Sequence, residues 1–159
     1  LRSYSLYLES LREWYASEAA QDFVQNRNEA MKLLQKEAEL QEVVQLVGPD
    51  ALPEAEQAIL GTARMLREDF LQQSAFVDYD MYTPIKKQYL MLKAILHMHR
   101  RITDAISEGV PYKSITASQK MFERVARMKE IAPDEKMELQ FGAVMNDIDG
   151  AVEELKRGV

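Results

Sequence analysis

The sequence contains no cysteine, which excludes disulfide bonds, thiolate metal sites and cysteine nucleophiles. Its two histidines, His97 and His99, stand two positions apart in the sequence. On a helix they project about 200° apart, so they cannot hold a metal together on one face. No Glu-x2-His pattern accompanies them, as a di-iron helical bundle would require. We expect one histidine to be exposed and the other to lie at the edge of the core.

Glycine-rich signatures are also missing. The six glycines form neither a Gly-x4-Gly-Lys pattern nor a Gly-x-Gly-x2-Gly pattern, so the chain encodes no phosphate-binding loop. The serines lack the nucleophile elbow of hydrolases, and no apolar run approaches the roughly 18 residues that a membrane span needs. Nothing in the sequence resembles a signal peptide. We therefore predict no catalytic residue, no metal site and no direct membrane insertion in this chain.

What the chain does have is the composition of an ordinary globular protein. Its 159 residues, 47% of them hydrophobic and 29% charged, are enough for one domain with a single sizeable core. The net charge of -6 argues against a nucleic-acid partner, because such proteins normally carry a basic stripe. The chain begins at Leu1, without an initiator methionine, and we expect it to be a fragment of something longer.

Every long segment repeats its apolar residues with a helical period, and no segment of useful length alternates with period two. We therefore predict an all-α bundle of about six helices and no sheet. The segment 110–120 has the weakest helical pattern and is the expected hinge or sub-boundary. The predicted helices are a first one striped by Tyr4, Leu8, Leu11 and Tyr15, a second at 22–47, a third at 53–73, a fourth from 84 to 109, a fifth marked by Met121, Val125 and Met128, and a sixth opened at 133. The fourth carries two apolar rows, so we expect it to be the most buried.

The most informative stretch runs from Glu37 to Pro84 and predicts a helical hairpin. Its first helix ends at Gly48-Pro49, because glycine accepts left-handed dihedral angles and proline cannot continue the hydrogen-bond ladder. Its second helix starts at Pro53, with acidic residues beside the positive end of the helix dipole. We expect each helix to have one apolar face. These faces are Leu40, Val43, Val44 and Val47 on the first helix, and Ile59, Ala63, Leu66 and Phe70 on the second.

Acidic residues gather at the turn of this hairpin. Asp50, Glu54 and Glu56 have the chemistry of a general-acid cluster or a metal site, but no histidine and no enclosing apolar wall accompany them. Two interpretations stay open. The acids are either solvated residues at a helix start or a charged contact surface for a partner.

Aromatic and amide residues gather where the second helix ends. Phe70 and Phe76 are core residues by default. The Gln72-Gln73 pair next to Phe76 allows a second interpretation, because an amide can read the edge of a heterocycle while an aromatic ring stacks on its face.

At this stretch the sequence resembles the C-terminal helical domain of the catalytic subunit of rotary ATPases. Within that family it is most similar to the A subunit of archaeal (A-type) and vacuolar-type ATPases. The matching blocks fall in the family's order and spacing between residues 3 and 112, and beyond Tyr112 only 126–129 matches. The blocks are Ser3–Leu8, Leu11–Trp14, Glu39–Glu54, Ala63–Phe76, Tyr82–Pro84 and Lys87–Lys93.

The resemblance implies a contact with the central rotor shaft. The acidic lever of the more distant F-type catalytic subunit follows the pattern Gly-x-Asp-x-Leu-x-Glu-x-acid. In the family this turn touches the shaft and transmits torque. Three acids stand here where the F-type lever has five, so we expect shape to count for more than charge. The implied contact residues are Gly48, Pro49, Asp50, Leu52, Glu54 and Glu56.

The resemblance also implies a share of a nucleotide site. In the A-type family the Gln-Gln-x-Ala-Phe segment lines the adenine of bound nucleotide. That role carries over to Gln72, Gln73, Ala75 and Phe76, with Phe76 as the stacking residue. Ser74 departs from the pattern, in which asparagine is expected.

The chemistry itself is implied to lie elsewhere. The family's phosphate loop, catalytic glutamate and magnesium ligands belong to an upstream nucleotide-binding domain of the same subunit. We therefore expect ATP or ADP with Mg²⁺ to bind in the parent subunit, and no cofactor to bind this fragment, which should be inactive alone. The implied partners are the upstream domain, the non-catalytic B subunits and the central stalk subunits of a proton- or sodium-translocating complex. The implied location is cytoplasmic, in the soluble head peripheral to the membrane.

Residues 1–159 are then a single C-terminal domain, with a lever hairpin at about 22–73 and a weakly matched tail at 113–159. Two other interpretations rest on composition alone. One is a free-standing helical adaptor that binds partner helices through its aromatic first segment. The other is a bundle that binds a small molecule in an interior pocket around the methionines.

Overall fold

The computed structural model describes residues 18–72 and 85–158, and within these ranges the chain is helical and contains no strand. The prediction of an all-α bundle of about six helices is confirmed, although the expected helix from Tyr4 to Tyr15 lies outside the described residues. The six described α-helices are α2 (Glu18–Val47), α3 (Glu54–Met65), α5 (Ile85–Ser107), α6 (Tyr112–Ala117), α7 (Gln119–Ala126) and α8 (Met137–Arg157).

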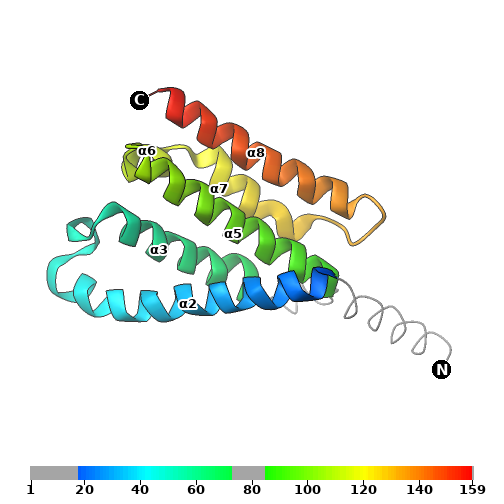
Figure 1. Cartoon of the computed structure of the whole chain (residues 1–159), viewed down its shortest axis with the longest axis horizontal. Helices are drawn as coiled ribbons and strands as arrows, with labels where there is room; N and C mark the ends of the chain where they lie inside the picture. The colour runs from blue at the N-terminus through cyan, green and yellow to red at the C-terminus, as the bar shows by residue number, and fades with distance from the viewer. Residues whose placement is uncertain (1–17, 73–84, 159) are drawn as a thin grey trace.

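Helix α5 lies in the middle of the bundle (Figure 1). It packs against α2 and α3 on one side and against α8 on the other. Leu92 and Leu96 are buried in its centre, as the two apolar rows of the sequence predict. Because α5 is covered from both sides, it connects the α2–α3 hairpin mechanically to the C-terminal part of the chain.

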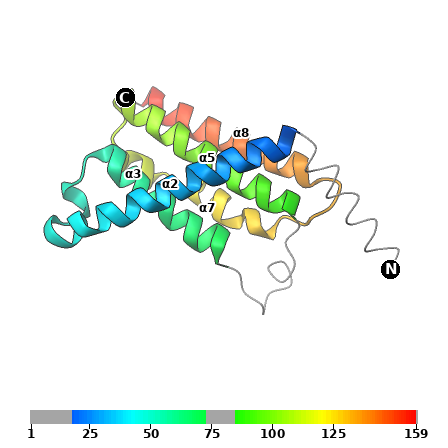
Figure 2. The ribbon, with the colours of Figure 1, turned by 60° about the horizontal axis from the view of Figure 1, so that its bottom comes forward.

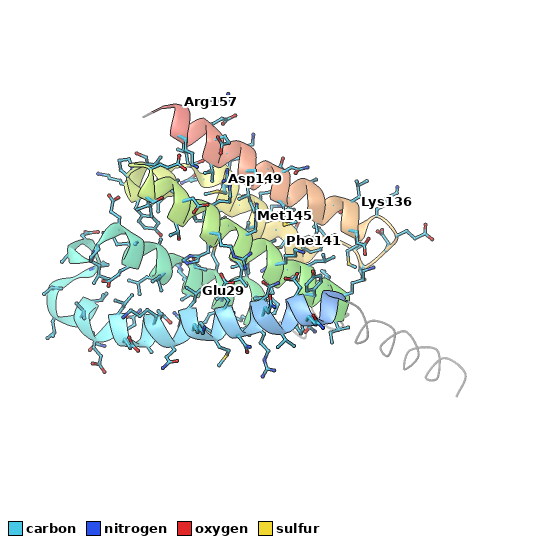
Figure 3. The ribbon with its side chains drawn as sticks, viewed as in Figure 1. Glu29, Lys136, Phe141, Met145, Asp149 and Arg157 are labelled. Carbon is cyan, nitrogen blue, oxygen red and sulfur yellow. The ribbon has the colours of Figure 1, made fainter. Side chains whose placement is uncertain are left out.

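Helix α8 closes the bundle with a regular apolar stripe. Phe141, Val144, Ile148 and Val152 recur at helical spacing, and each is at most 1% exposed. Phe141 is the largest of them and belongs to the core cluster (Figure 3). The tail that the family resemblance covers weakly is therefore part of the same core as the hairpin.

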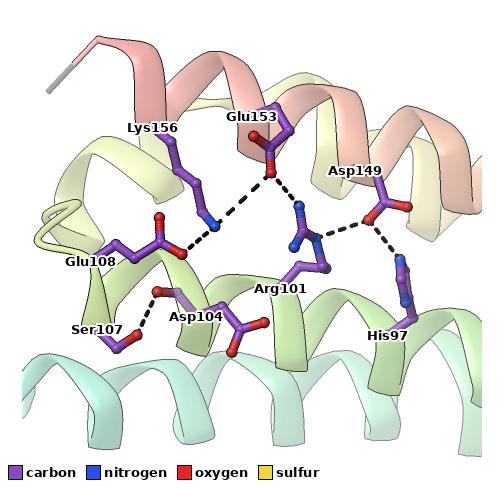
Figure 4. A network of polar contacts seen from close by, with 8 residues as sticks. All are labelled: His97, Arg101, Asp104, Ser107, Glu108, Asp149, Glu153 and Lys156. Carbon is purple, nitrogen blue, oxygen red and sulfur yellow. Dashed lines mark hydrogen bonds and ion pairs between the residues drawn. The ribbon is translucent and has the colours of Figure 1, made fainter.

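A row of polar side chains, most of them charged, runs along the interface between α5 and α8 (Figure 4). His97 Nε2 lies 2.8 Å from Asp149 Oδ1, and Arg101 Nε lies 2.9 Å from the same oxygen. Arg101 Nη2 also donates to Glu153 at 2.5 Å. These contacts are partly solvated, so each adds about 0–1 kcal/mol, and the apolar stripe beneath them holds the two helices together.

The segment 110–120 is packed helix rather than an open linker. Val110 and Ile115 are each 1% exposed, and α6 occupies most of the segment. A helix of six residues shows too little apolar repeat for a sequence pattern to reveal it. Tyr112 lies against α3 at Gly61, where any Cβ atom would overlap the tyrosine hydroxyl. Glycine at this position therefore allows α6 to dock onto the hairpin, and burial raises the pKa of the Tyr112 phenol.

Helix boundaries follow the turn chemistry closely. The second predicted helix ends at Val47 as expected, and the predicted stop at Gly109 falls two residues after α5 ends. The third predicted helix, 53–73, divides into α3 and a π-helical turn, Leu66–Leu71. The helix expected from Pro133 begins only at Met137, because residues 132–136 form a turn in which Lys136 N–H donates to Asp134 Oδ1 at 2.9 Å.

Candidate functional site

Helices α2 and α3 form an antiparallel hairpin whose turn projects beyond the ends of the neighbouring helices (Figure 2). On α2, buried side chains recur with alternating spacings of four and three residues, the repeat of a coiled-coil seam. Helix α2 packs against α3 and also against α5, where Arg100 Nη2 donates to Asn26 Oδ1 at 3.3 Å. The buried seam residues of α2 are Asn26, Ala30, Leu33, Glu37 and Leu40.

The turn of the hairpin, Gly48–Glu56, is called the tip here. Gly48 adopts a φ of 83°, a left-handed value that suits glycine, and its N–H donates to Val44 O at 2.9 Å. A 3-10 turn, Pro49–Ala51, follows. Gln57 then closes the tip by donating from Nε2 to Leu52 O at 2.8 Å. The tip is therefore ordered by backbone geometry and hydrogen bonds.

All six residues expected to contact the rotor shaft lie in this tip. Pro49, Asp50 and Glu54 are exposed, whereas Gly48 and Glu56 are half-buried. Leu52 is different, because it is only 6% exposed and faces inward. Leu52 and Leu40 are buried but stand apart from the contiguous core cluster. Leu52 therefore supports the tip from inside, and a partner would meet the other five residues.

Beside the tip, the last turns of α2 expose apolar side chains. Val43 is 41%, Leu46 85% and Val47 59% exposed. The predicted apolar face of this helix is therefore wrong in its outer half, since only Leu40 of that set is fully buried. The reason is that α3 begins at Glu54, after a short compact turn, and leaves the end of α2 uncovered. Leu46 was missed because it falls off the predicted stripe.

At the other end of the hairpin, α3 leads into the π turn and then into Gln72. The Gln72 N–H donates to Arg67 O at 2.9 Å, a bond across five residues that defines the π geometry. Gln72 is exposed. The other expected adenine residues, Gln73, Ala75 and Phe76, lie outside the described residues, so their predicted role stays a prediction.

A charged pair joins α2 to this π turn. Both terminal nitrogens of the Arg67 guanidinium donate to the two carboxylate oxygens of Glu37. The Glu37 side chain is only 4% exposed, whereas that of Arg67 is 51% exposed. Gln41 Nε2 donates to Glu37 Oε1 at 3.2 Å. The hydrogen bonds from Arg67 hold the pKa of Glu37 below its usual range, so the carboxylate stays charged inside the seam. The sequence signal for this pair is Glu37 itself, an acidic residue at a seam position where an apolar residue is expected.

The two histidines differ from expectation, because neither is exposed. His97 pairs with Asp149, as described above. His99 Nδ1 lies 2.8 Å from Thr62 Oγ1, and that hydroxyl donates to Ala58 O at 3.0 Å. His99 is thus held at the interface of α5 with α3 by the Thr62 hydroxyl. Among the described residues, no group of three or more His, Asp or Glu is placed to hold a metal ion.

We expect the stability of the chain to fall as the pH drops from 7.5 to 5.5 because of His99. Burial lowers the pKa of His99, opposed by nearby Glu29 and assisted by Arg100. The unfolded chain takes up its proton at about pH 6.5, so below that pH it binds more protons than the folded chain does. The loss should reach about 1.4 kcal/mol for each unit by which the pKa is lowered. Urea unfolding at both pH values measures it.

The variant that tests this prediction is His99→Gln. It should reduce the difference in unfolding free energy between the two pH values. A full pH effect in His99→Gln would show that another group causes it.

Among the residues that the structure describes, the interpretation of a small-molecule pocket around the methionines gains no support. A groove of about 620 Å³ lies between α7 and α8, but polar and charged side chains such as Arg124, Asp147 and Gln140 line most of it. The buried methionines belong to the packed core cluster. They are Met65, Met91, Met98, Met121, Met128 and Met137.

None of the helices in the described ranges combines the length and the apolar character needed to cross a bilayer. The described part of the hairpin has an ordered tip with exposed acidic groups at one end and exposed apolar groups beside that tip. At the other end it has the charged pair of Glu37 and Arg67.

Comparison with known proteins gives one consistent result. A family model described as the C-terminal domain of V and A type ATP synthase matches residues 12–116. The A subunit of the A-type ATP synthase of Methanopyrus kandleri is 49% identical over 155 residues, which are 98% of this chain and 26% of that protein. Its counterpart in Thermococcus onnurineus is 46% identical over the same shares. The A subunit numbered 2 of the A-type ATP synthase of Methanospirillum hungatei is 50% identical over 130 residues, which are 82% of this chain and 22% of that protein. The chain thus spans about a quarter of the length of these relatives.

Proposed function

Since the chain belongs to the family of C-terminal domains of V and A type ATP synthases, we propose that it is the lever of a catalytic A subunit. In this proposal the tip presses on the central rotor shaft, while Gln72, Gln73, Ala75 and Phe76 contribute to the adenine pocket. The hairpin between them couples ATP synthesis or hydrolysis to rotation.

The observation that supports this proposal is that the tip and Gln72, the one expected adenine residue in the described ranges, stand at opposite ends of α3 and its π turn. The tip and the exit at Gln72 are joined by α3 and the π turn, and α2 runs alongside. A helix transmits displacement along its axis because all of its backbone hydrogen bonds lie parallel to it. The coiled-coil-like seam and α5 stiffen it further.

The side chains at the tip and beside it favour an apolar contact with the shaft over an ionic one. Leu46 and Val47 are more than half exposed, and burying one such side chain contributes about 1.5–3 kcal/mol. A solvated ion pair formed by Asp50 or Glu54 would contribute about 0–1 kcal/mol. Burial of an apolar side chain would therefore contribute more to the contact than a solvated ion pair would. This agrees with the expectation that shape counts for more than charge.

The remaining parts of the reaction belong to the parent subunit. We propose that an upstream nucleotide-binding domain supplies the phosphate loop and the magnesium ligands, and that ATP or ADP with Mg²⁺ binds there. The B subunits and the central stalk are the proposed neighbours in a proton- or sodium-translocating complex. Its catalytic head would lie on the cytoplasmic side of the membrane. The adaptor alternative gains nothing, because the first segment on which it rests lies outside the described residues.

The test of this proposal is the pair of substitutions Leu46→Ser and Val47→Ser in the reconstituted complex. Without their apolar contact, ATP-driven ion transport should fall about 5-fold or more. The paired change Asp50→Asn and Glu54→Gln should lower transport only about 2-fold. Ion transport and ATP hydrolysis are measured on the same preparations, so that loss of coupling is separated from loss of enzyme.

Leu139→Ser is the matched control for this test. Leu139 is also largely exposed, at 77%, but it lies on α8, which begins at the end of the molecule opposite the tip (Figure 1). This variant should transport ions like the wild type. Unchanged transport in the Leu46→Ser/Val47→Ser complex would rule out an apolar contact between the end of α2 and the shaft.

A further inference from the structure

Glu37 is a charged residue at a seam position of α2 where an apolar residue is expected. It follows Ala30 and Leu33 in the seam of α2 and precedes Leu40, all of which are buried. Removing a carboxylate from water costs several kcal/mol, and an ion pair often does no better than apolar side chains of similar volume. Stability alone therefore does not account for Glu37.

What Glu37 and Arg67 add is a single fixed register. Apolar contacts are non-directional, so a seam of alanine and leucine permits small displacements of one helix along the other. The two parallel hydrogen bonds from Arg67 to Glu37 form in only one relative placement of guanidinium and carboxylate. The pair thus sets the position of the π turn along α2 and also its rotation.

The position of Arg67 in the chain connects this register to the adenine segment. Arg67 is the second residue of the π turn, and its carbonyl oxygen accepts the hydrogen bond from Gln72 N–H. The side chain of Arg67 is therefore bound to α2 while its backbone holds Gln72. Gln72 is the first of the four proposed adenine residues, and Phe76 follows it by four positions.

We propose that Glu37 and Arg67 are positioning residues for adenine recognition, which hold the start of the adenine segment at a fixed place relative to the hairpin. They act through Gln72 and do not touch the nucleotide. This inference rests on the proposed function. Beyond that function, a displacement of the hairpin would change the position of the adenine contact through this one forked ion pair. The pair itself is dispensable for folding.

The experiment uses the assembled ATPase complex with Glu37→Met and Arg67→Met introduced together. The methionines keep the volume and remove the fork, so the melting temperature should be unchanged or higher. The KM for ATP should rise about 5-fold with little change in kcat, because the ring stacks in a less favourable position. The preference for ATP over GTP, measured as the ratio of kcat/KM values, should fall by a similar factor. Arg67→Lys, which keeps the charge but cannot fork, should fall between this variant and the wild type.

The control removes an ion pair between two helices far from the exit. Arg124 and Asp147 join α7 to α8 at 2.8 Å, and Arg124→Met with Asp147→Met should leave KM and nucleotide preference unchanged. A wild-type KM and preference in the Glu37→Met/Arg67→Met complex would overturn the inference. If Phe76→Ala still raises the KM in that case, the proposed function survives. If Phe76→Ala also has no effect, the adenine role fails and this inference fails with it.

Discussion

Phe76→Ala in the full-length subunit is expected to raise the KM for ATP about 5- to 100-fold. The loss of one base-stacking contact costs roughly 1–3 kcal/mol, and each 1.4 kcal/mol corresponds to a factor of ten in affinity. The phosphates and Mg²⁺ are bound by the upstream domain in our proposal, so kcat should change much less than KM. Steady-state ATP hydrolysis by the assembled complex measures both constants.

Phe76→Tyr serves as the conservative control, because a tyrosine ring stacks as well as a phenylalanine ring. It should retain a KM close to that of the wild type. The melting temperature of the alanine variant decides between the two interpretations of Phe76. A severe loss of thermal stability with an unchanged KM would show that Phe76 is a core residue and would remove the nucleotide contact from the proposal.

Phe141→Ala should produce the largest loss of stability, lowering the free energy of unfolding by about 3–5 kcal/mol. Phe141 is 1% exposed in the core cluster, on the helix that packs along α5. Replacing it leaves a cavity that the surrounding helices fill only in part. The melting temperature should fall by on the order of 10 °C. Chemical unfolding of the 159-residue chain, followed by circular dichroism, measures the change.

This prediction also tests whether the hairpin and the tail are one domain. Because α5 packs against both, the variant should unfold in a single transition at a lower urea concentration. Leu139→Ala, on the same helix but 77% exposed, should change the free energy of unfolding by less than about 0.5 kcal/mol. Two separate transitions would mean that the tail 113–159 is a distinct unit.

The parts of the fold that could be predicted from the sequence are those with a strong local cause. The end of α2 at Val47 follows from Gly48-Pro49, and the burial of α5 follows from its two apolar rows. The segment 110–120, expected as a hinge or sub-boundary, contains α6, which is held by contacts distant in sequence, including that of Tyr112 with Gly61. Its role as a hinge stays a prediction. A six-residue helix has no period strong enough to predict it.

The candidate site was predictable at its tip and less so elsewhere. Turn chemistry and acidic residues place Gly48 to Glu56 together without any knowledge of packing. The exposure of Leu46 and Val47 depends on where α3 begins, so it emerges only from the three-dimensional arrangement. Glu37 and Arg67 are separated by thirty positions in the sequence. Their pairing depends on the π turn that follows α3, and the spacing of apolar residues does not reveal such an irregular turn.

The two leucines beneath the tip, Leu40 and Leu52, are buried apart from the contiguous core. Regions with few buried apolar contacts open at a lower free energy than the core does. A load applied at Gly48–Glu56 would therefore disturb the packing of these two leucines before it disturbs the packing around α5. In the function that we propose, the hairpin would be a stiff rod with a compliant end. That end would store part of each push elastically and release it as the shaft moves on, so that discrete steps at the nucleotide would become smoother torque.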